Sequence, residues 1–171
     1  AELGPGVSGP AVGTRVAVIP HLVCGRCGPC RTETFNFCEQ LRCMGAEADG
    51  VHVQYLNVPA RMALPIPDRM SLEDAAMMEP ACVGYHAARR ADIRPGDRVL
   101  VVGAGPIGIF AAQSCRALGA EAVYLADKDA FRLDLARRLG ADGTIDVSRE
   151  SLADGLARLA GRAAGRAADL A

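Results

Sequence analysis

The stretch Arg98-Val99-Leu100-Val101-Val102-Gly103-Ala104-Gly105-Pro106-Ile107-Gly108 joins an apolar run of strand length to a G-x-G-x-x-G pattern. The glycine pattern alone is weak evidence, but between a predicted strand and a predicted helix it indicates a turn that binds a dinucleotide pyrophosphate. Gly103 allows the tight turn, Gly105 lets the backbone approach the phosphates, and Gly108 allows the helix to pack closely on the strand.

The residues after this turn alternate between helical and strand patterns. We expect the phosphates at the helix N-terminus, where Pro106 has no N–H to offer and Ile107 is therefore the expected donor. Alternating helices and strands predict right-handed crossovers and a parallel sheet, which is an α/β fold. The predicted elements are helix 106–118, strand 122–126, helix 130–139, strand 144–147 and helix 151–160, and a fourth strand is expected to begin where the chain stops at Ala171.

Asp127 follows the second predicted strand of this series. A carboxylate there can accept hydrogen bonds from the adenosine ribose hydroxyls and would repel a 2′-phosphate, so NAD is predicted rather than NADP. Lys128 and Arg132 leave NADP open, because a basic side chain there can accommodate the phosphate, and we count Arg132 among the cofactor-binding candidates. The alternative is a glycine-rich turn in a flavin-binding or unrelated α/β domain.

The first half of the chain does not show this regular alternation of strands and helices. Residues 15–19 and 51–58 are predicted strands, and Ser71 with Asp74 marks a helix start before residues 75–78. A second helix is predicted at 82–91. We place the boundary between the two parts near residue 87, which gives domains 1–86 and 87–171.

Four cysteines follow the spacing Cys24-x2-Cys27-x2-Cys30-x7-Cys38. Four thiolates satisfy tetrahedral Zn²⁺, and short spacers let one loop surround the ion, so these cysteines are predicted ligands of a structural zinc in a lobe spanning residues 21–45. The site would have no open position for substrate and would order a segment that lacks a core of its own. The alternative is a set of buried or disulfide-paired cysteines, and Cys43 is expected to take no part.

Composition excludes several classes of function. The 171 residues carry a net charge of −1 and only 4% aromatics, which argues against a nucleic-acid partner and against a zinc ribbon that binds one. No apolar run is long enough to span a membrane. Clustered cysteines beside a nucleotide loop favour a reducing compartment, so a cytoplasmic location is expected. Because the chain starts at Ala1 rather than Met, we expect that a preceding segment is missing.

Glu79 lies in the apolar stretch Met77-Met78-Glu79-Pro80. From the residues alone, a carboxylate at a helix end that faces water is the plainer interpretation. His21, His52 and His86 are isolated, and each is expected to be a surface or core residue rather than a ligand.

Taken together, the cysteine cluster and the glycine-rich turn resemble those of the zinc-dependent medium-chain dehydrogenases, which include the alcohol and polyol dehydrogenases. Val12–Ile19 and Asp49–Leu56 also resemble family segments, although Thr14 and Gln54 replace the usual Asp and Glu. The resemblance covers about residues 12–170. It implies part of a GroES-like β-barrel catalytic domain with the zinc lobe, followed by the first half of a Rossmann domain that binds NAD.

The resemblance also changes the interpretation of Glu79. In the sorbitol, threonine and sugar-acid dehydrogenase branches, a Glu-Pro pair supplies a carboxylate to the catalytic zinc, directly or through its water. It therefore implies that Glu79 is a catalytic residue and metal ligand. The segments 70–76 and 83–87 also resemble that side of the family.

The implied activity is hydride transfer between NAD and a secondary alcohol such as a polyol, sugar alcohol or sugar acid. Alternatives are a threonine 3-dehydrogenase, a non-zinc relative such as a quinone reductase, and an inactive fragment that binds zinc and nucleotide. A complete enzyme is expected to be about twice as long, with the remaining catalytic-zinc ligands outside this chain, and to form a dimer or tetramer.

Overall fold

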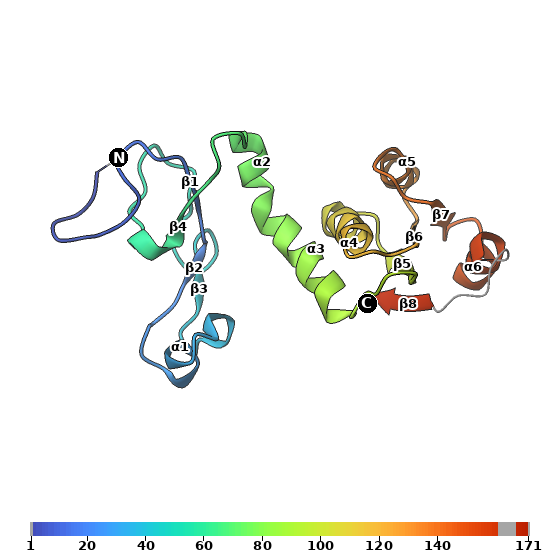
Figure 1. Cartoon of the computed structure of the whole chain (residues 1–171), viewed down its shortest axis with the longest axis horizontal. Coiled ribbons are helices and arrows are strands. Elements are labelled where there is room, and N and C mark those ends of the chain that lie inside the picture. Colours follow the sequence, from blue (N-terminus) through green and yellow to red (C-terminus); the bar gives the residue numbers. More distant parts are fainter. Residues whose placement is uncertain (1, 161–166, 171) are drawn as a thin grey trace. The chain divides into compact units, whose positions relative to one another are not determined.

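The computed structural model describes residues 2–160 and 167–170, and the chain divides into two compact units, Ala1–Ala76 and Met77–Ala171 (Figure 1). The division falls ten residues before the boundary expected near residue 87. Helix α3 (Met78–Arg90) accounts for the difference, because it packs against helix α4 (Pro106–Ala117) of the second unit. At this contact a Cβ on Gly84 would lie 2.5 Å from the backbone nitrogen of Ala111.

The first unit contains short strands and single helical turns. Two antiparallel pairs form its sheets, β1 with β4 and β2 with β3, and Met62 and Ile66 are among its few buried apolar side chains. Its elements are β1 (Val16–Val18), β2 (His21–Leu22), α1 (Gly28–Arg31), η1 (Phe35–Phe37), β3 (Arg42–Cys43), η2 (Ala60–Met62), β4 (Ala63–Pro65) and α2 (Leu72–Ala76).

The strand predicted at residues 51–58 is absent, and this prediction was wrong. Val51, Val53 and Tyr55 are 52%, 55% and 87% exposed, so the alternating pattern faces no core. A strand also needs a neighbouring strand for its backbone hydrogen bonds, and none pairs with this segment within the described residues.

The predicted helix start at Ser71 is confirmed. Ser71 Oγ accepts the backbone N–H of Asp74 at 2.9 Å, which caps α2. The second predicted helix is longer than expected, because α3 begins at Met78 rather than at residue 82. Pro80 lies in its first turn, where the helix needs no backbone N–H from it.

The second unit has the predicted alternation of strands and helices. Its parallel sheet has the order β7-β6-β5-β8, and β8 supplies the expected fourth strand slightly earlier than predicted. The elements after α3 are β5 (Arg98–Val102), α4, β6 (Ala122–Asp127), α5 (Ala130–Arg138), β7 (Gly143–Asp146), α6 (Leu152–Ala160) and β8 (Ala167–Leu170).

The sheet of this unit carries a core on each face. Val99, Val123 and Leu125 pack with residues of α3, α4 and α5 on one face, whereas Ile145 belongs to a second cluster that Leu156 of α6 covers. Aliphatic side chains buried this completely contribute about 1.5–3 kcal/mol each. The core therefore fixes the positions of β5 and β6, whose carboxyl ends carry the predicted cofactor residues.

Candidate functional site

The glycine-rich turn follows directly from the end of β5. Gly103 has a φ of +103°, a conformation that side-chain-bearing residues rarely adopt, and its N–H donates to Ala126 O at 2.7 Å. Gly105 is the N-cap residue of α4, and Pro106 occupies the first turn of that helix. The backbone therefore leaves the sheet and enters the helix within three residues.

Gly105 and Gly108 differ in the space around them. A Cβ on Gly108 would lie 1.8 Å from Gly103 O, so this position tolerates no side chain. A Cβ on Gly105 would meet nothing within 4 Å, and its φ of −72° suits any residue. The protein itself does not require glycine at 105, whereas close approach by a ligand would.

The N-terminus of α4 is able to receive an anion. Within the described residues no side chain caps this helix, so the first-turn N–H groups, including that of Ile107, are not satisfied by a capping side chain. An uncapped N-terminus of a twelve-residue helix favours negative charge. Pyrophosphate has the charge and the acceptor oxygens that such an end binds.

Asp127, at the carboxyl end of β6, lies beside the turn. Its Oδ2 accepts the N–H of Ala104 at 2.7 Å, and its Oδ1 accepts the N–H of Asp129 at 2.9 Å. Burial acts to raise the pKa of Asp127, but these backbone donors and the charge of Arg132 outweigh it and hold the pKa below its usual range. The side chain is therefore an anion at neutral pH.

The two basic side chains near Asp127 are accessible. Arg132 Nη1 lies 3.9 Å from Asp127 Oδ2 with its side chain 53% exposed, and Lys128 is also exposed. At that distance and exposure the ion pair is weak, so the guanidinium remains available to other anions.

Asp129 is a local determinant that the sequence interpretation missed. Its Oδ1 accepts the N–H groups of Phe131 and Arg132 and so caps α5. An Asp immediately before a helical pattern is a standard start signal, and it could have been found. The bond between Asp127 and Ala104 leaves no comparable signal in the sequence.

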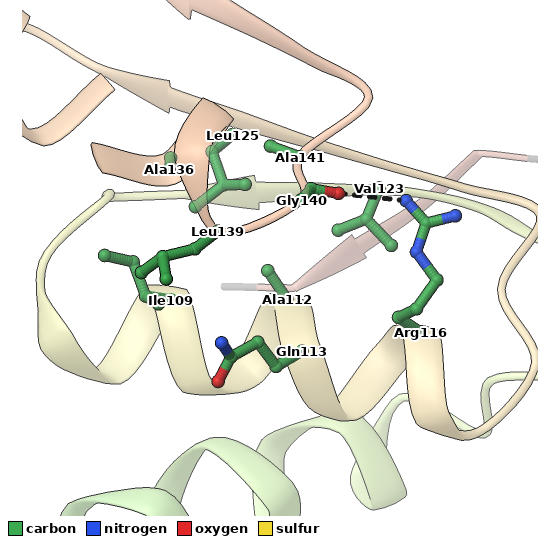
Figure 2. Close-up of a pocket in the computed structure, with 10 residues that line it drawn as sticks. All are labelled: Ile109, Ala112, Gln113, Arg116, Val123, Leu125, Ala136, Leu139, Gly140 and Ala141. Carbon is green, nitrogen blue, oxygen red and sulfur yellow. Dashed lines mark hydrogen bonds between the residues drawn. The ribbon is translucent and has the colours of Figure 1, made fainter. Parts of the chain in front are cut away.

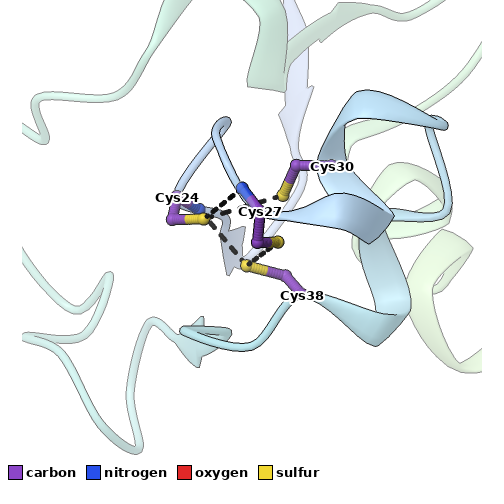
Figure 3. Close-up of side chains that lie close together, drawn as sticks. All are labelled: Cys24, Cys27, Cys30 and Cys38. Atoms are coloured by element: carbon purple, nitrogen blue, oxygen red, sulfur yellow. Dashed lines mark hydrogen bonds between the residues drawn. The ribbon is translucent and has the colours of Figure 1, made fainter.

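The four predicted zinc ligands lie together in the first unit (Figure 3). The sulfur atoms of Cys24, Cys27, Cys30 and Cys38 all lie within 4.8 Å of one another, with 3.9 Å between Cys24 and Cys30 and 4.0 Å between Cys27 and Cys38. Zn–S bonds of about 2.3 Å in a tetrahedron place the sulfurs about 3.8 Å apart. The separations fit zinc and are far too long for disulfide bonds, so the four cysteines are not disulfide-paired.

Backbone N–H groups point at these sulfurs, as expected where thiolate charge must be stabilised. Cys38 Sγ accepts from the N–H of Cys24 at 3.3 Å and of Gln40 at 3.4 Å. The N–H groups of Arg26 and Cys27 lower the pKa of Cys24 to about 6, whereas burial raises the pKa of Cys30 to about 12. A dication at the centre would favour the thiolate form of all four.

The remaining candidates do not join either site. Glu79 lies in the first turn of α3 and is exposed, and His21, His52 and His86 are exposed as well. Apart from the four cysteines, no group of three or more His, Cys, Asp or Glu side chains among the described residues is close enough to hold a metal ion. Cys43 stays outside the cluster, and its thiol donates to Met44 O.

A cavity of about 200 Å³ lies between α4 and α5, on the face of β6 that these helices cover (Figure 2). Ile109, Ala112 and Leu139 contribute apolar surface, and the guanidinium of Arg116 is engaged by the carbonyl groups of Gly140 and Glu121. None of the glycine-rich turn residues lines it. Its lining is mainly apolar, and Gln113 contributes an amide side chain.

Known proteins combine the same two parts. Residues 1–68 match the alcohol dehydrogenase GroES-like domain, and residues 106–171 match the zinc-binding dehydrogenase domain. The chain belongs to the zinc-dependent medium-chain dehydrogenase family. Its two short β-sheets represent the GroES-like part, and its parallel sheet is Rossmann-like.

Curated relatives in this family include L-threonine 3-dehydrogenases and polyol dehydrogenases. L-threonine 3-dehydrogenase of Marinomonas sp. is 41% identical over 153 residues, which are 90% of this chain and 45% of that protein. Probable D-xylulose reductase A of Arthroderma otae is 36% identical over 171 residues, covering 99% and 48% respectively. The chain thus spans about half the length of the curated relatives it matches.

Solved structures of relatives contain both forms of nicotinamide cofactor. An Escherichia coli CFT073 alcohol dehydrogenase complexed with NADH superposes with a TM-score of 0.86 and 35% identity, covering 99% of this chain and 50% of that chain. A putative zinc-binding dehydrogenase from Sinorhizobium meliloti 1021 bound to NADP gives a TM-score of 0.83 and 33% identity, covering 90% and 45%. Among the described residues, no helix has the length and apolar character needed to cross a membrane.

Proposed function

We propose that this chain supplies the structural-zinc lobe and the first half of the cofactor domain of an oxidoreductase that transfers hydride between a secondary alcohol and NAD. The alcohol would be a polyol, a sugar alcohol or a sugar acid. The observation that carries the proposal is the uncapped N-terminus of α4 beside the partly buried carboxylate of Asp127, in a chain that also brings four cysteine sulfurs together.

The zinc in the cysteine cluster would have a structural role. Four protein sulfurs complete a tetrahedral shell and leave no position for water or substrate. Of the residues in the lobe at 21–45, only Cys30 and Cys38 are buried, so apolar packing contributes little to its order. The metal would hold the segment from Cys24 to Cys38 in one conformation.

The dinucleotide would lie along the carboxyl ends of β5 and β6. Gly103, Gly105, Pro106, Ile107 and Gly108 would surround the pyrophosphate, and Asp127 would accept hydrogen bonds from the ribose hydroxyls. The relatives do not decide between NAD and NADP, because their structures contain either. The negative charge of Asp127 favours NAD, which lacks the 2′-phosphate.

Glu79 would contribute a carboxylate to the catalytic zinc site once further ligands are supplied. A zinc ion bound there would polarise the alcohol and lower its pKa. The chain's own residues would position the cofactor and exclude water around it. A single exposed carboxylate does not hold zinc against water, so Glu79 acts only together with groups that the described residues do not provide.

Threonine 3-dehydrogenase activity is the second candidate. It is favoured by the 41–42% identity to several L-threonine 3-dehydrogenases, compared with 40% to an L-idonate 5-dehydrogenase and 36% to a sorbitol dehydrogenase. Threonine and polyols both present a secondary hydroxyl group, so the same chemistry serves either substrate. We also propose a cytoplasmic enzyme that forms a dimer or tetramer, which sedimentation of the extended protein would test.

Extending the chain at both ends and replacing Glu79 tests the assignment of the catalytic carboxylate. The 171-residue chain should not reduce NAD with polyols, sugar acids or threonine, whereas the extended protein should reduce it with one of these classes. In the extended protein, Glu79→Ala should lower kcat/KM by about 10–100-fold or more, because the catalytic zinc loses a carboxylate in its immediate surroundings. The four-cysteine zinc should remain, as measured by metal analysis. Unchanged turnover in this variant would leave Glu79 as an ordinary solvent-facing side chain.

Cofactor preference tests the role of the Asp127 charge. The extended protein should use NAD at least tenfold better than NADP in kcat/KM, which corresponds to about 1.4 kcal/mol. Arg132→Ala should widen the preference by removing the cation nearest to where a 2′-phosphate would lie. A native preference for NADP would contradict the assignment and transfer the main role to Arg132 and Lys128.

A further inference from the structure

The carboxylate of Asp127 is already engaged by the protein's own backbone. One oxygen accepts the N–H of Ala104 at 2.7 Å, and the other accepts the N–H of Asp129 at 2.9 Å. Ala104 lies between Gly103 and Gly105 in the glycine-rich turn, and Asp129 caps α5. A single side chain therefore joins the turn after β5 to the start of the helix after β6.

Burial makes the bond to Ala104 important for the shape of the turn. Ala104 is 1% exposed and the Asp127 side chain is 9% exposed, so water does not readily replace the carboxylate. A buried N–H that loses its acceptor is strongly destabilised, and the backbone moves to satisfy it. The neighbouring Gly103 is held by its own bond to Ala126 O at 2.7 Å, so movement would fall on Ala104 and Gly105.

We propose that Asp127 is a positioning residue whose carboxylate sets the conformation of the glycine-rich turn for the pyrophosphate, independently of any contact with the ribose. This inference rests on the dinucleotide site proposed above and adds a second role to one of its residues. A carboxylate that acted only on the ribose would have no effect on a ligand without ribose hydroxyls. A carboxylate that positions the turn would affect every ligand that carries the pyrophosphate.

A pair of nucleotides separates the two roles. ADP carries both ribose hydroxyls and the pyrophosphate, whereas 2′,3′-dideoxy-ADP carries only the pyrophosphate. Both would be titrated by NMR into the 171-residue chain and into its Asp127→Ala variant. We expect the variant to bind dideoxy-ADP about tenfold more weakly, because the turn no longer presents its N–H groups in place, and to lose more affinity for ADP.

The direction of the dideoxy-ADP effect is itself informative. Removing a negative charge near a phosphate site should strengthen phosphate binding if charge were the only contribution of Asp127. Weaker binding therefore requires the positioning role. Asp127→Asn keeps one carbonyl oxygen for Ala104 while removing the charge, so it should recover much of the dideoxy-ADP affinity that the alanine variant loses.

Amide exchange of the nucleotide-free chain provides a second measurement. The Ala104 amide should exchange slowly in the unmodified chain and at least tenfold faster in Asp127→Ala, while Val99 and Leu100 in β5 stay protected and report an intact sheet. Asp129→Ala is the matched control. It removes the cap from Phe131 and Arg132 but leaves the Ala104 bond, so Ala104 exchange and dideoxy-ADP affinity should not change.

Two results would overturn the inference. One is unchanged or tighter dideoxy-ADP binding in Asp127→Ala, and the other is an Ala104 amide whose exchange does not respond to that substitution. Failure of the unmodified chain to bind ADP would instead count against the proposed cofactor site, and the exchange experiment would still decide whether Asp127 shapes the turn.

Discussion

Replacing Cys27 by Ser is expected to lower the metal content of the reduced, purified protein from about one zinc per chain to almost none. Three thiolates and a hydroxyl bind zinc far more weakly than four thiolates do, since the hydroxyl is not ionised at neutral pH. The lobe should then lose its order, because zinc binding by such small sites contributes about 10–16 kcal/mol, which is also their folding free energy.

The effect should be confined to the lobe. The parallel sheet of the second unit has its own core around Val99, Leu125 and Ile145, so amide exchange there should stay slow. Cys43→Ser is the matched control, because Cys43 lies close in sequence but outside the cluster, and it should keep its zinc. Unchanged zinc content and unchanged protection of residues 24–38 in Cys27→Ser would refute the assignment.

Replacing Gly108 by Ala is expected to destabilise the second unit by about 3 kcal/mol or more, at the upper end of overpacking costs. The added Cβ would meet Gly103 O at 1.8 Å, and that oxygen belongs to backbone held between β5 and α4. Because the turn and the helix start cannot both stay in place, nucleotide binding should be lost together with stability. Urea unfolding of the two proteins would measure the difference.

Gly105→Ala is the informative comparison. Its Cβ would enter open space at an ordinary φ, so stability should change little. ADP affinity should nevertheless fall, because the methyl group would occupy the space that the phosphates approach. A Gly108→Ala variant as stable as the unmodified protein would contradict the packing described here, whereas full ADP affinity in Gly105→Ala would contradict the phosphate position.

The second unit could be predicted from sequence almost element by element. Its strands are short and mainly apolar, and helices α4 and α5 are followed by Gly119 and Gly140, so local patterns and tertiary packing agree. The clustering of the four cysteines could also be predicted from their spacing, because fewer than fifteen residues separate the first from the last.

The first unit was less predictable because its order depends on partners that a local pattern does not reveal. Residues 51–58 alternate like a strand but lie in the open, without a neighbouring strand to bond with. The extent of α3 was underestimated because this helix belongs to the second unit through its packing on α4, where Gly84 makes the contact. Sequence periodicity does not show which helix another helix will pack against. The hydrogen bond between Asp127 and Ala104 joins positions 23 residues apart, and no local sequence pattern indicates it.

The position of β8 in the sheet has a kinetic consequence. Strand β6 reaches β5 through one helix, whereas β8 returns to the other side of β5 after three further elements (α5, β7 and α6) and pairs Ala167 with Arg98. Arg98 and its β8 partner Ala167 are 69 residues apart in the sequence, whereas Arg98 and its β6 partner Ala122 are only 24 residues apart. Since distant pairings must first overcome the entropy of closing a long loop, we expect β8 to dock after the β5-β6 ladder has formed. The point between β5 and β8 where the chain reverses its direction of winding is then assembled last. If the dinucleotide binds at this edge of the sheet as proposed above, it would favour chains that have completed the sheet.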